Sequence, residues 1–314
     1  MAYVNTLLGT IDPEEMGITA IHEHIMWGLP GWEYDPGYWF DIGYAFEKCY
    51  HDLIDFRLVG GGTYVDCSGI SLGRHLAIYT KLAKSTGLNI VASTGFWADY
   101  GIAPHFRTKD IDYFEDLFIR ELTQGMGHTL VKAGIIKVGN GEETFTELEE
   151  IEYRAAARAA KRTGAAVITE GVHFALKQLE ILLSEKVDPS RIIIAHLDSE
   201  GYMDLERDKQ IAHAGAYVSY DQAGIENTWS RTRYAMPDER RVELVSAMLE
   251  AGFQDRILLS SSSKCWGLGR GEAHRHMIGH VLRYFVPKLK QAGVSEAAIN
   301  AMLLENPKHV LPIQ

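Results

Sequence analysis

The chain has 314 residues, a formal net charge of −11 and 46% hydrophobic residues. This apolar content can form a folded core, which excludes the disordered and fibrous classes. The excess of 42 acidic over 31 basic residues argues against a nucleic-acid partner, and no apolar stretch approaches the roughly 18 residues of a membrane span. The three cysteines have no CxxC spacing, which favours a reducing, cytoplasmic location. The 13 histidines are the unusual count.

Short apolar runs rich in β-branched residues recur along the chain and alternate with stretches of helical period. In chain order, we predict strands at 17–21, 63–66, 89–93, 133–138, 165–169, 191–195, 216–220 and 256–260. The clearest helical patterns cover 147–162, 174–185, 238–251 and 274–291. Continuous apolar strands that alternate with helices are typical of a parallel sheet covered on both faces.

Eight such units predict the α/β class and a single (β/α)8 TIM barrel, which forms one domain over residues 1–314. A doubly wound open sheet is the alternative, but no GxGxxG motif follows the first predicted strand. The segment 25–46 is rich in aromatic residues. We interpret it as a long loop that acts as a lid or subunit contact, or that packs on its own barrel.

Polar residues with catalytic chemistry fall at the carboxyl ends of the predicted strands. The first strand leads into His22-x-His24, the fourth contains Lys137, the fifth is followed by Glu170 and the sixth by His196. Active sites of TIM barrels lie at this end, so we expect these side chains to converge. Imidazoles bind zinc and similar ions, and a lysine forced into an apolar barrel favours its neutral form, which can react with CO2 to give a carbamate. These residues predict a metal site.

The chain resembles the phosphotriesterase family of the amidohydrolase superfamily, which includes the phosphotriesterase-like lactonases. The resemblance runs from about Thr6 to Leu311, and its motifs are His22-x-His24, 93–96, 133–138, 194–196 and 306–311. It implies an amidohydrolase-type barrel and a metal-dependent hydrolase, often a homodimer. The small-molecule substrates that it implies are lactones, carboxylic esters and, in some members, organophosphate triesters.

The resemblance also implies roles for single residues. His22 and His24 would hold the more buried of two divalent metal ions, which we expect to be zinc. Lys137 would be carbamylated and would bridge the two ions. His196 would hold the more exposed ion.

Two metal ligands of the family pattern are replaced in this chain. Glu170 stands where the family has a histidine, and Ser262 stands where it has an aspartate that binds the buried ion and accepts a proton from water. A serine hydroxyl is a poor metal ligand and a weak base. A small register shift would offer His173 in place of Glu170.

Three interpretations follow from these replacements. In the first, which we favour, one or two ions remain, Glu170 is an oxygen ligand, and another carboxylate moves the proton; the candidates are Asp198, Glu200, Asp221 and Glu170 itself. In the second, the chain is a catalytically weak or metal-free binding barrel in which Lys137 and Glu170 form a buried ion pair. In the third, both replacements were introduced into a parent protein. We take Lys137, Glu170, Ser262 and Asp198 as candidate catalytic residues.

Aromatic residues after the third, seventh and eighth strands predict a site for an apolar or aryl-bearing substrate. The candidate substrate-binding residues are Phe96, Trp97, Tyr100, Asp221, Trp229 and Trp266. Gln222 occupies a position where family lactonases commonly carry an arginine, which weakens the case for an acyl-homoserine lactone. We predict hydrolysis of a lactone or a carboxylic ester.

Overall fold

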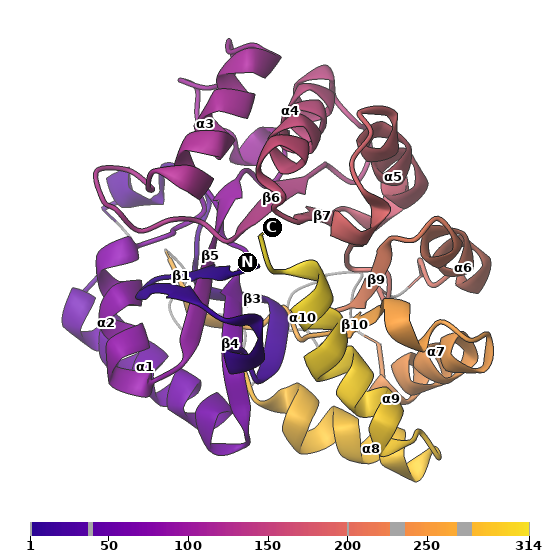
Figure 1. Cartoon of the computed structure of the whole chain (residues 1–314). Helices are drawn as coiled ribbons and strands as arrows, with labels where there is room; N and C mark the ends of the chain where they lie inside the picture. Colours follow the sequence, from indigo (N-terminus) through magenta and orange to yellow (C-terminus); the bar gives the residue numbers. More distant parts are fainter. Residues whose placement is uncertain (1, 37–39, 200, 227–235, 269–277, 314) are drawn as a thin grey trace.

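The computed structural model describes residues 2–36, 40–199, 201–226, 236–268 and 278–313. In these ranges nine parallel strands form one curled sheet in the order β10-β9-β8-β7-β6-β5-β4-β3-β11, and helices cover its outer face (Figure 1). The strands are β3 (Ile18–Trp27), β4 (Gly61–Asp66), β5 (Asn89–Gly95), β6 (Ile135–Gly139), β7 (Val167–Glu170), β8 (Ile192–Ile194), β9 (Tyr217–Tyr220), β10 (Ile257–Leu259) and β11 (Lys264–Gly267). This confirms the predicted (β/α)8 TIM barrel.

Most strands lie where the apolar runs predict them, and the differences fall at the first and last strands. β3 extends well beyond the predicted end at residue 21, because the backbone from His24 to Trp27 pairs with β11. β11 itself was not predicted, since Lys264 and Gly267 interrupt its apolar pattern. The polar His22-Glu23-His24 segment therefore lies inside a strand.

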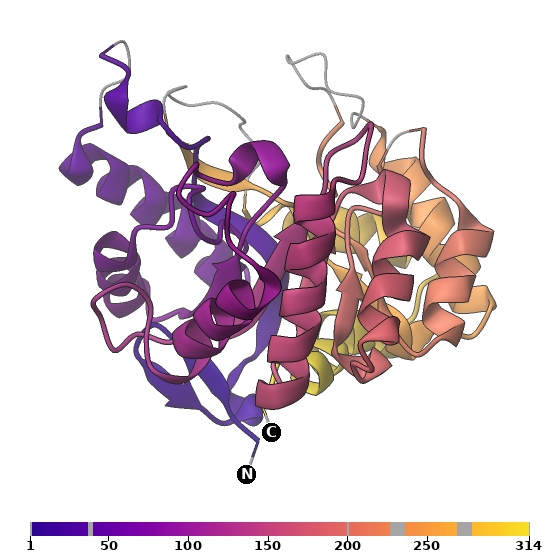
Figure 2. The same ribbon diagram turned by 90° about the horizontal axis from the view of Figure 1, so that it is seen from above.

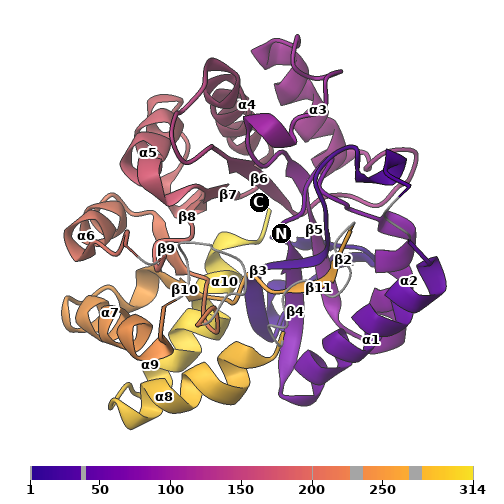
Figure 3. The same cartoon turned by 180° about the vertical axis from the view of Figure 1, so that it is seen from behind.

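The helices follow the predicted alternation and form a ring outside the strands (Figures 1 and 3). They are α1 (Ile42–Leu58), α2 (Leu76–Thr86), α3 (Ile111–Thr123), α4 (Glu147–Thr163), α5 (Ala175–Ser184), α6 (Leu205–His213), α7 (Asp238–Glu250), α8 (Val286–Gln291), α9 (Glu296–Asn300) and α10 (Asn306–Val310). The long loop predicted at 25–46 is shorter than expected. It lies between the end of β3 at Trp27 and the start of α1, which Asp41 caps by accepting a hydrogen bond from Tyr44 N.

The barrel closes between β10 and β3 through a run of serines in place of a regular ladder. Ser262 N donates to His22 O at 3.1 Å, and His24 N donates to Ser263 O at 2.8 Å. His22 N donates to the Ser260 hydroxyl at 3.0 Å. These bonds tie the strand that carries both histidines to the last strand of the barrel.

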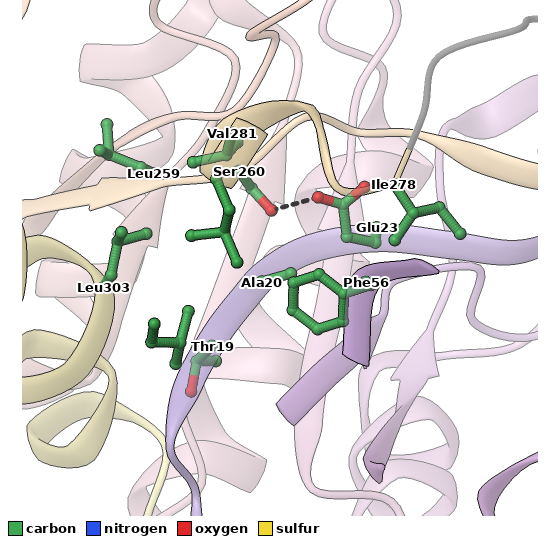
Figure 4. Close-up of a pocket in the computed structure, with 11 residues that line it drawn as sticks. Thr19, Ala20, Glu23, Phe56, Leu259, Ser260, Ile278, Val281 and Leu303 are labelled. Carbon is green, nitrogen blue, oxygen red and sulfur yellow. Dashed lines mark hydrogen bonds between the residues drawn. The ribbon is translucent and has the colours of Figure 1, made fainter. Parts of the chain in front are cut away.

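Glu23 holds this closure from the outer face of the sheet, because side chains alternate along β3 and those of His22 and His24 lie on the opposite face. Its carboxylate accepts a hydrogen bond from Ser260 Oγ at 2.7 Å (Figure 4). It also accepts hydrogen bonds from Ser263 N at 2.6 Å and from Ser261 N at 2.9 Å. We call Glu23 together with Ser260, Ser261 and Ser263 the serine seam. A cavity of about 10 Å³ lies beside it, against Phe56 of α1.

The two ends of the described chain meet at the end of the barrel opposite the loops that follow the strands (Figure 2). Tyr3 and Ile313 form an antiparallel bridge, with N–H to O distances of 3.1 and 2.8 Å. A short hairpin of β1 (Val4–Thr6) and β2 (Gly9–Ile11) lies at the same end. Within the described ranges, no helix has the length and apolar character needed to cross a membrane.

Candidate metal centre at the strand ends

Three side chains from separate strands meet at the carboxyl end of the barrel. A ring nitrogen of His22 on β3, a carboxylate oxygen of Glu170 at the end of β7 and a ring nitrogen of His196 just after β8 all lie within 4.8 Å of one another. His196 Nε2 is 3.2 Å from Glu170 Oε1, and His22 Nε2 is 3.9 Å from Glu170 Oε2. The two imidazole rings stack almost parallel, with centroids 4.7 Å apart and planes at 9°.

Asp221, directly after β9, holds both rings. Its Oδ2 lies 2.8 Å from His22 Nδ1 and its Oδ1 lies 2.6 Å from His196 Nδ1. An ionised carboxylate only accepts hydrogen bonds, so the Nδ1 atom of each ring carries the proton. Both Nε2 atoms therefore face Glu170, which is the orientation that carboxylate–histidine pairs give to metal ligands.

Asp221 is itself fixed by its neighbours. It also accepts a bond from the backbone N of His196 at 2.9 Å, which helps to hold that residue at its unusual φ of 62°. Asp198 accepts from Asp221 N at 3.1 Å and pairs with Arg241 Nε at 3.0 Å. Asp198 is fully buried, so the structure places it behind Asp221 as a positioning residue, away from the proton-transfer role that we expected.

Burial and charge set the protonation of this group. Burial lowers the pKa of His22 to about 4, against the opposing effect of Asp221. Burial also acts to lower the pKa of His196, but the carboxylates of Asp221 and Glu170 outweigh it and raise that pKa to about 10. For Glu170, the raising effect of burial is outweighed by Lys137 and His196, which hold its pKa well below the usual value.

Lys137 enters the group from β6. Its side chain is fully buried and its Nζ forms an ion pair with Glu170 Oε2. A second, weaker contact of 3.5 Å joins Nζ to the carbonyl oxygen of Cys67. Four candidate residues that the sequence predicted to converge lie together in the structure: His22, Lys137, Glu170 and His196.

The residues present fit a divalent cation. His22 Nε2 is buried and has no hydrogen-bond partner in the described part of the chain, and such an atom is costly unless something binds it. Two imidazole nitrogens and one carboxylate oxygen form a ligand set found in catalytic zinc sites, which keep a further position for water. Asp221 supplies the outer support that such ligands require.

The structure leaves the predicted ligand His24 and the candidate catalytic residue Ser262 outside this group. The His24 ring lies 5.6 Å from that of His22 between centroids, and its Nδ1 is 3.3 Å from Ser68 Oγ. Ser262 adopts a left-handed φ of 46°. The alternative ligand His173 does not replace Glu170 either, because its ring packs on Tyr202 at a centroid distance of 4.1 Å.

Aromatic residues lie at the carboxyl ends of β3 and β5, which is the end of the barrel where the group lies. Trp27 lies edge-on to Trp97 at 5.6 Å between ring centroids, and Trp97 lies edge-on to Tyr100 at 4.7 Å. Tyr100 is 58% exposed. Trp27 belongs to the aromatic-rich segment 25–46 that the sequence pointed out.

The other predicted substrate-binding aromatics lie elsewhere. Phe96 is fully buried and packs against Phe106, Phe114 and Phe118, between the sheet and α3, so it belongs to the core and not to an open mouth. Trp266 is buried with its ring edge-on to Tyr44 of α1. Trp229 lies outside the described residues.

A parallel barrel with a histidine–carboxylate group at its strand ends is the arrangement of the amidohydrolase-type barrels. Residues 2–311 match the model of the phosphotriesterase family. The chain belongs to the phosphotriesterase family. This confirms the resemblance seen in the sequence motifs.

Several relatives cover nearly the whole chain. It is 30% identical over 310 residues to an aryldialkylphosphatase of Saccharolobus solfataricus, and this match covers 95% of this chain and 96% of the relative. It is 26% identical to the N-acetyltaurine hydrolase of Danio rerio, over 98% of this chain and 97% of the relative. The solved organophosphorus hydrolase of Deinococcus radiodurans superposes with a TM-score of 0.91 at 27% identity, covering 98% and 96% of the two chains. These relatives are all hydrolases.

Proposed function

We propose that the chain is a metal-dependent hydrolase in which activated water attacks a lactone or a carboxylic ester, with a zinc ion held by His22, Glu170 and His196. The observation that carries this proposal is the buried Nε2 of His22, which has no partner among the described residues and faces Glu170 and His196. When bound, a divalent ion supplies Lewis acidity and makes water a stronger acid.

The protein side chains divide the remaining work. Asp221 keeps both imidazole rings turned so that their Nε2 atoms face Glu170. Asp198 and Asp221 are fully buried and engaged in hydrogen bonds, whereas the Glu170 side chain is 17% exposed. Of these three carboxylates, Glu170 is therefore the one that water can reach.

The substrate class follows from the aromatic residues at the same end of the barrel. Trp97 and Tyr100 follow the carboxyl end of β5 and form an aromatic pair, and such surface suits an apolar or aryl-bearing acyl compound. Relatives whose names refer to phosphatase and organophosphorus hydrolase activity add an organophosphate triester as a second substrate to assay.

The test is hydrolysis of an aryl ester, a lactone and an aryl phosphotriester by protein purified with zinc and bicarbonate. We expect measurable turnover that a chelator abolishes and zinc restores. The matched variant is His196→Asn, which keeps the size of the side chain close but removes one ligand. We expect a loss of at least about 100-fold in kcat/KM, as for a lost metal ligand.

Two results would contradict the proposal. One is a content below about 0.2 ions per chain after loading, since a catalytic site must hold its ion. The other is turnover that neither the chelator nor His196→Asn changes. The first result would favour the metal-free binding barrel, and the second would favour a barrel that hydrolyses its substrate without a metal.

A further inference from the structure

The contact between Lys137 and Glu170 bears on how the site obtains its negative charge. Lys137 is fully buried, and the Glu170 carboxylate lies directly against its Nζ. The same carboxylate also faces His22 Nε2 and His196 Nε2. Glu170 therefore stands between the lysine and both imidazoles, which is where a carboxylate grown on Lys137 would have to reach.

We propose that Glu170 takes the place of a lysine carbamate: Lys137 stays unmodified beside Glu170, and the site binds one divalent ion through His22, Glu170 and His196. This inference rests on the proposed function, since it concerns the same ion. It departs from the two-ion, carbamate-bridged site that the family resemblance implies.

The chemistry of carbamate formation supports this assignment. A carbamate forms when the nitrogen lone pair of a neutral amine attacks CO2, making an N–C bond and releasing a proton. Here the Glu170 carboxylate lies directly against Lys137 Nζ, in the place that the added CO2 would have to take. A carbamate would also bring a second buried anion against Glu170, and like charges at such short range repel.

The other half of the site gives a second ion little to bind. His24 Nδ1 lies 3.3 Å from Ser68 Oγ, and His24 is not part of the group formed by His22, Glu170 and His196. Ser262 offers a hydroxyl where a second ion would need a carboxylate, and hydroxyls are poor ligands. Over the described ranges, His22, Glu170 and His196 form the single group of three or more histidine, cysteine or acidic residues close enough to share an ion.

The experiment counts ions and modified lysines without an activity assay. The full chain is loaded with zinc in the presence of ¹³C-bicarbonate and freed of excess salt. Elemental analysis is expected to give about one ion per chain, as one catalytic ligand set requires, and ¹³C NMR is expected to show no carbamate carbon. Two ions per chain together with a carbamate carbon would overturn the inference.

Variants give a second, independent readout of zinc affinity. Lys137→Met is expected to keep one ion with an affinity within about threefold of the parent, because the ligands stay in place. A carbamate bridge would instead be lost with the lysine, and affinity would fall by more than about 100-fold. Glu170→Gln is expected to weaken zinc binding by at least about 100-fold, since it removes the anionic ligand. Unchanged zinc affinity in Glu170→Gln would also overturn the inference.

The double change Glu170→His with Ser262→Asp is the positive control. It installs the family ligands and frees Lys137, so it is expected to bind two ions and to show the carbamate carbon. The results also separate the two proposals. One ion, no carbamate and no hydrolysis would support this inference and contradict the proposed function. Two ions per chain with hydrolysis would contradict this inference and support a metal-dependent hydrolase. A protein that binds no ion would contradict both proposals.

Discussion

Two buried glutamates, Glu23 in the barrel wall and Glu152 on α4, show opposite ways of placing a carboxylate in a protein interior. Both side chains lie in the core, at 1% and 0% exposure. Glu23 accepts hydrogen bonds from five donors, namely the hydroxyls of Ser260, Ser261 and Ser263 and the backbone N–H groups of Ser261 and Ser263. Neither oxygen of Glu152 has a hydrogen-bond partner among the described residues.

The difference follows the distance from the candidate site. Glu23 lies between His22 and His24, so its bonds to the serine seam also fix the strand that carries both histidines. Glu152 lies on an outer helix. Burial, with Glu149 and Asp99 nearby, raises its pKa well above the usual value. Burial also raises the pKa of Glu23, but its hydrogen bonds to the serines oppose that effect. No such donors surround Glu152 in the described part of the chain.

The largest effect should come from breaking the serine seam. Glu23→Ala leaves three hydroxyls and two N–H groups without their acceptor, and each such buried donor is costly. We expect the free energy of unfolding to fall by about 3–5 kcal/mol, measured by urea denaturation. The control is Glu33→Ala at an exposed position, with a change within about 0.5 kcal/mol. A loss below about 1 kcal/mol in Glu23→Ala would show that the seam contributes little.

An effect of the opposite sign is expected at Glu152. Glu152→Met removes an unpaired buried carboxyl and keeps a similar volume, so the free energy of unfolding at pH 8 should rise by about 1–3 kcal/mol. The matched control is Glu149→Met on the same helix. Glu149 accepts bonds from Asp99 N, Gly141 N and Thr146 N, so its loss should destabilise. Equal effects of the two substitutions would refute the comparison.

The pH dependence of stability gives a further test at Glu152. Its pKa in the folded protein is raised above that in the unfolded chain. The folded state therefore binds more protons between the two values, and stability falls as the pH rises above the ordinary pKa of about 4.5. Denaturation curves from pH 4 to pH 8 should show a shallower decline in Glu152→Met than in the parent. Parallel curves would contradict the assignment.

The smallest effects should separate the serines between β10 and β11. Ser263→Ala removes one hydroxyl donor to Glu23 and should cost about 1–2 kcal/mol of unfolding free energy. Ser262→Ala should change it by less than about 0.5 kcal/mol, since the Ser262 hydroxyl is not part of the seam. Thermal unfolding of both variants measures the difference. A larger loss of unfolding free energy in Ser262→Ala than in Ser263→Ala would contradict the composition of the serine seam given above.

Local pattern predicted the barrel and four of the residues that meet in the site. Apolar runs of strand length, alternating with helical period, are a property of neighbouring residues, and His22, Lys137, Glu170 and His196 follow or lie within such runs. The bridging position of Asp221 and the donors to Glu23 depend on contacts between distant strands, which local period does not encode. The same limit explains Phe96: its place in the chain was near the mouth, but the direction of its ring was set by the phenylalanines of α3.

The serine seam also bears on how the barrel comes together. The bond between Ser260 and Glu23 joins residues 237 positions apart, so it cannot form until nearly all of the chain is present. Contacts of such long range require the entropy of loop closure to be lost before they can stabilise the protein, and they therefore slow folding. During synthesis on a ribosome, Glu23 and the two histidines of β3 would lack these contacts until residues 260–263 have been made. We therefore expect the candidate metal centre to be among the last parts of the protein to become ordered.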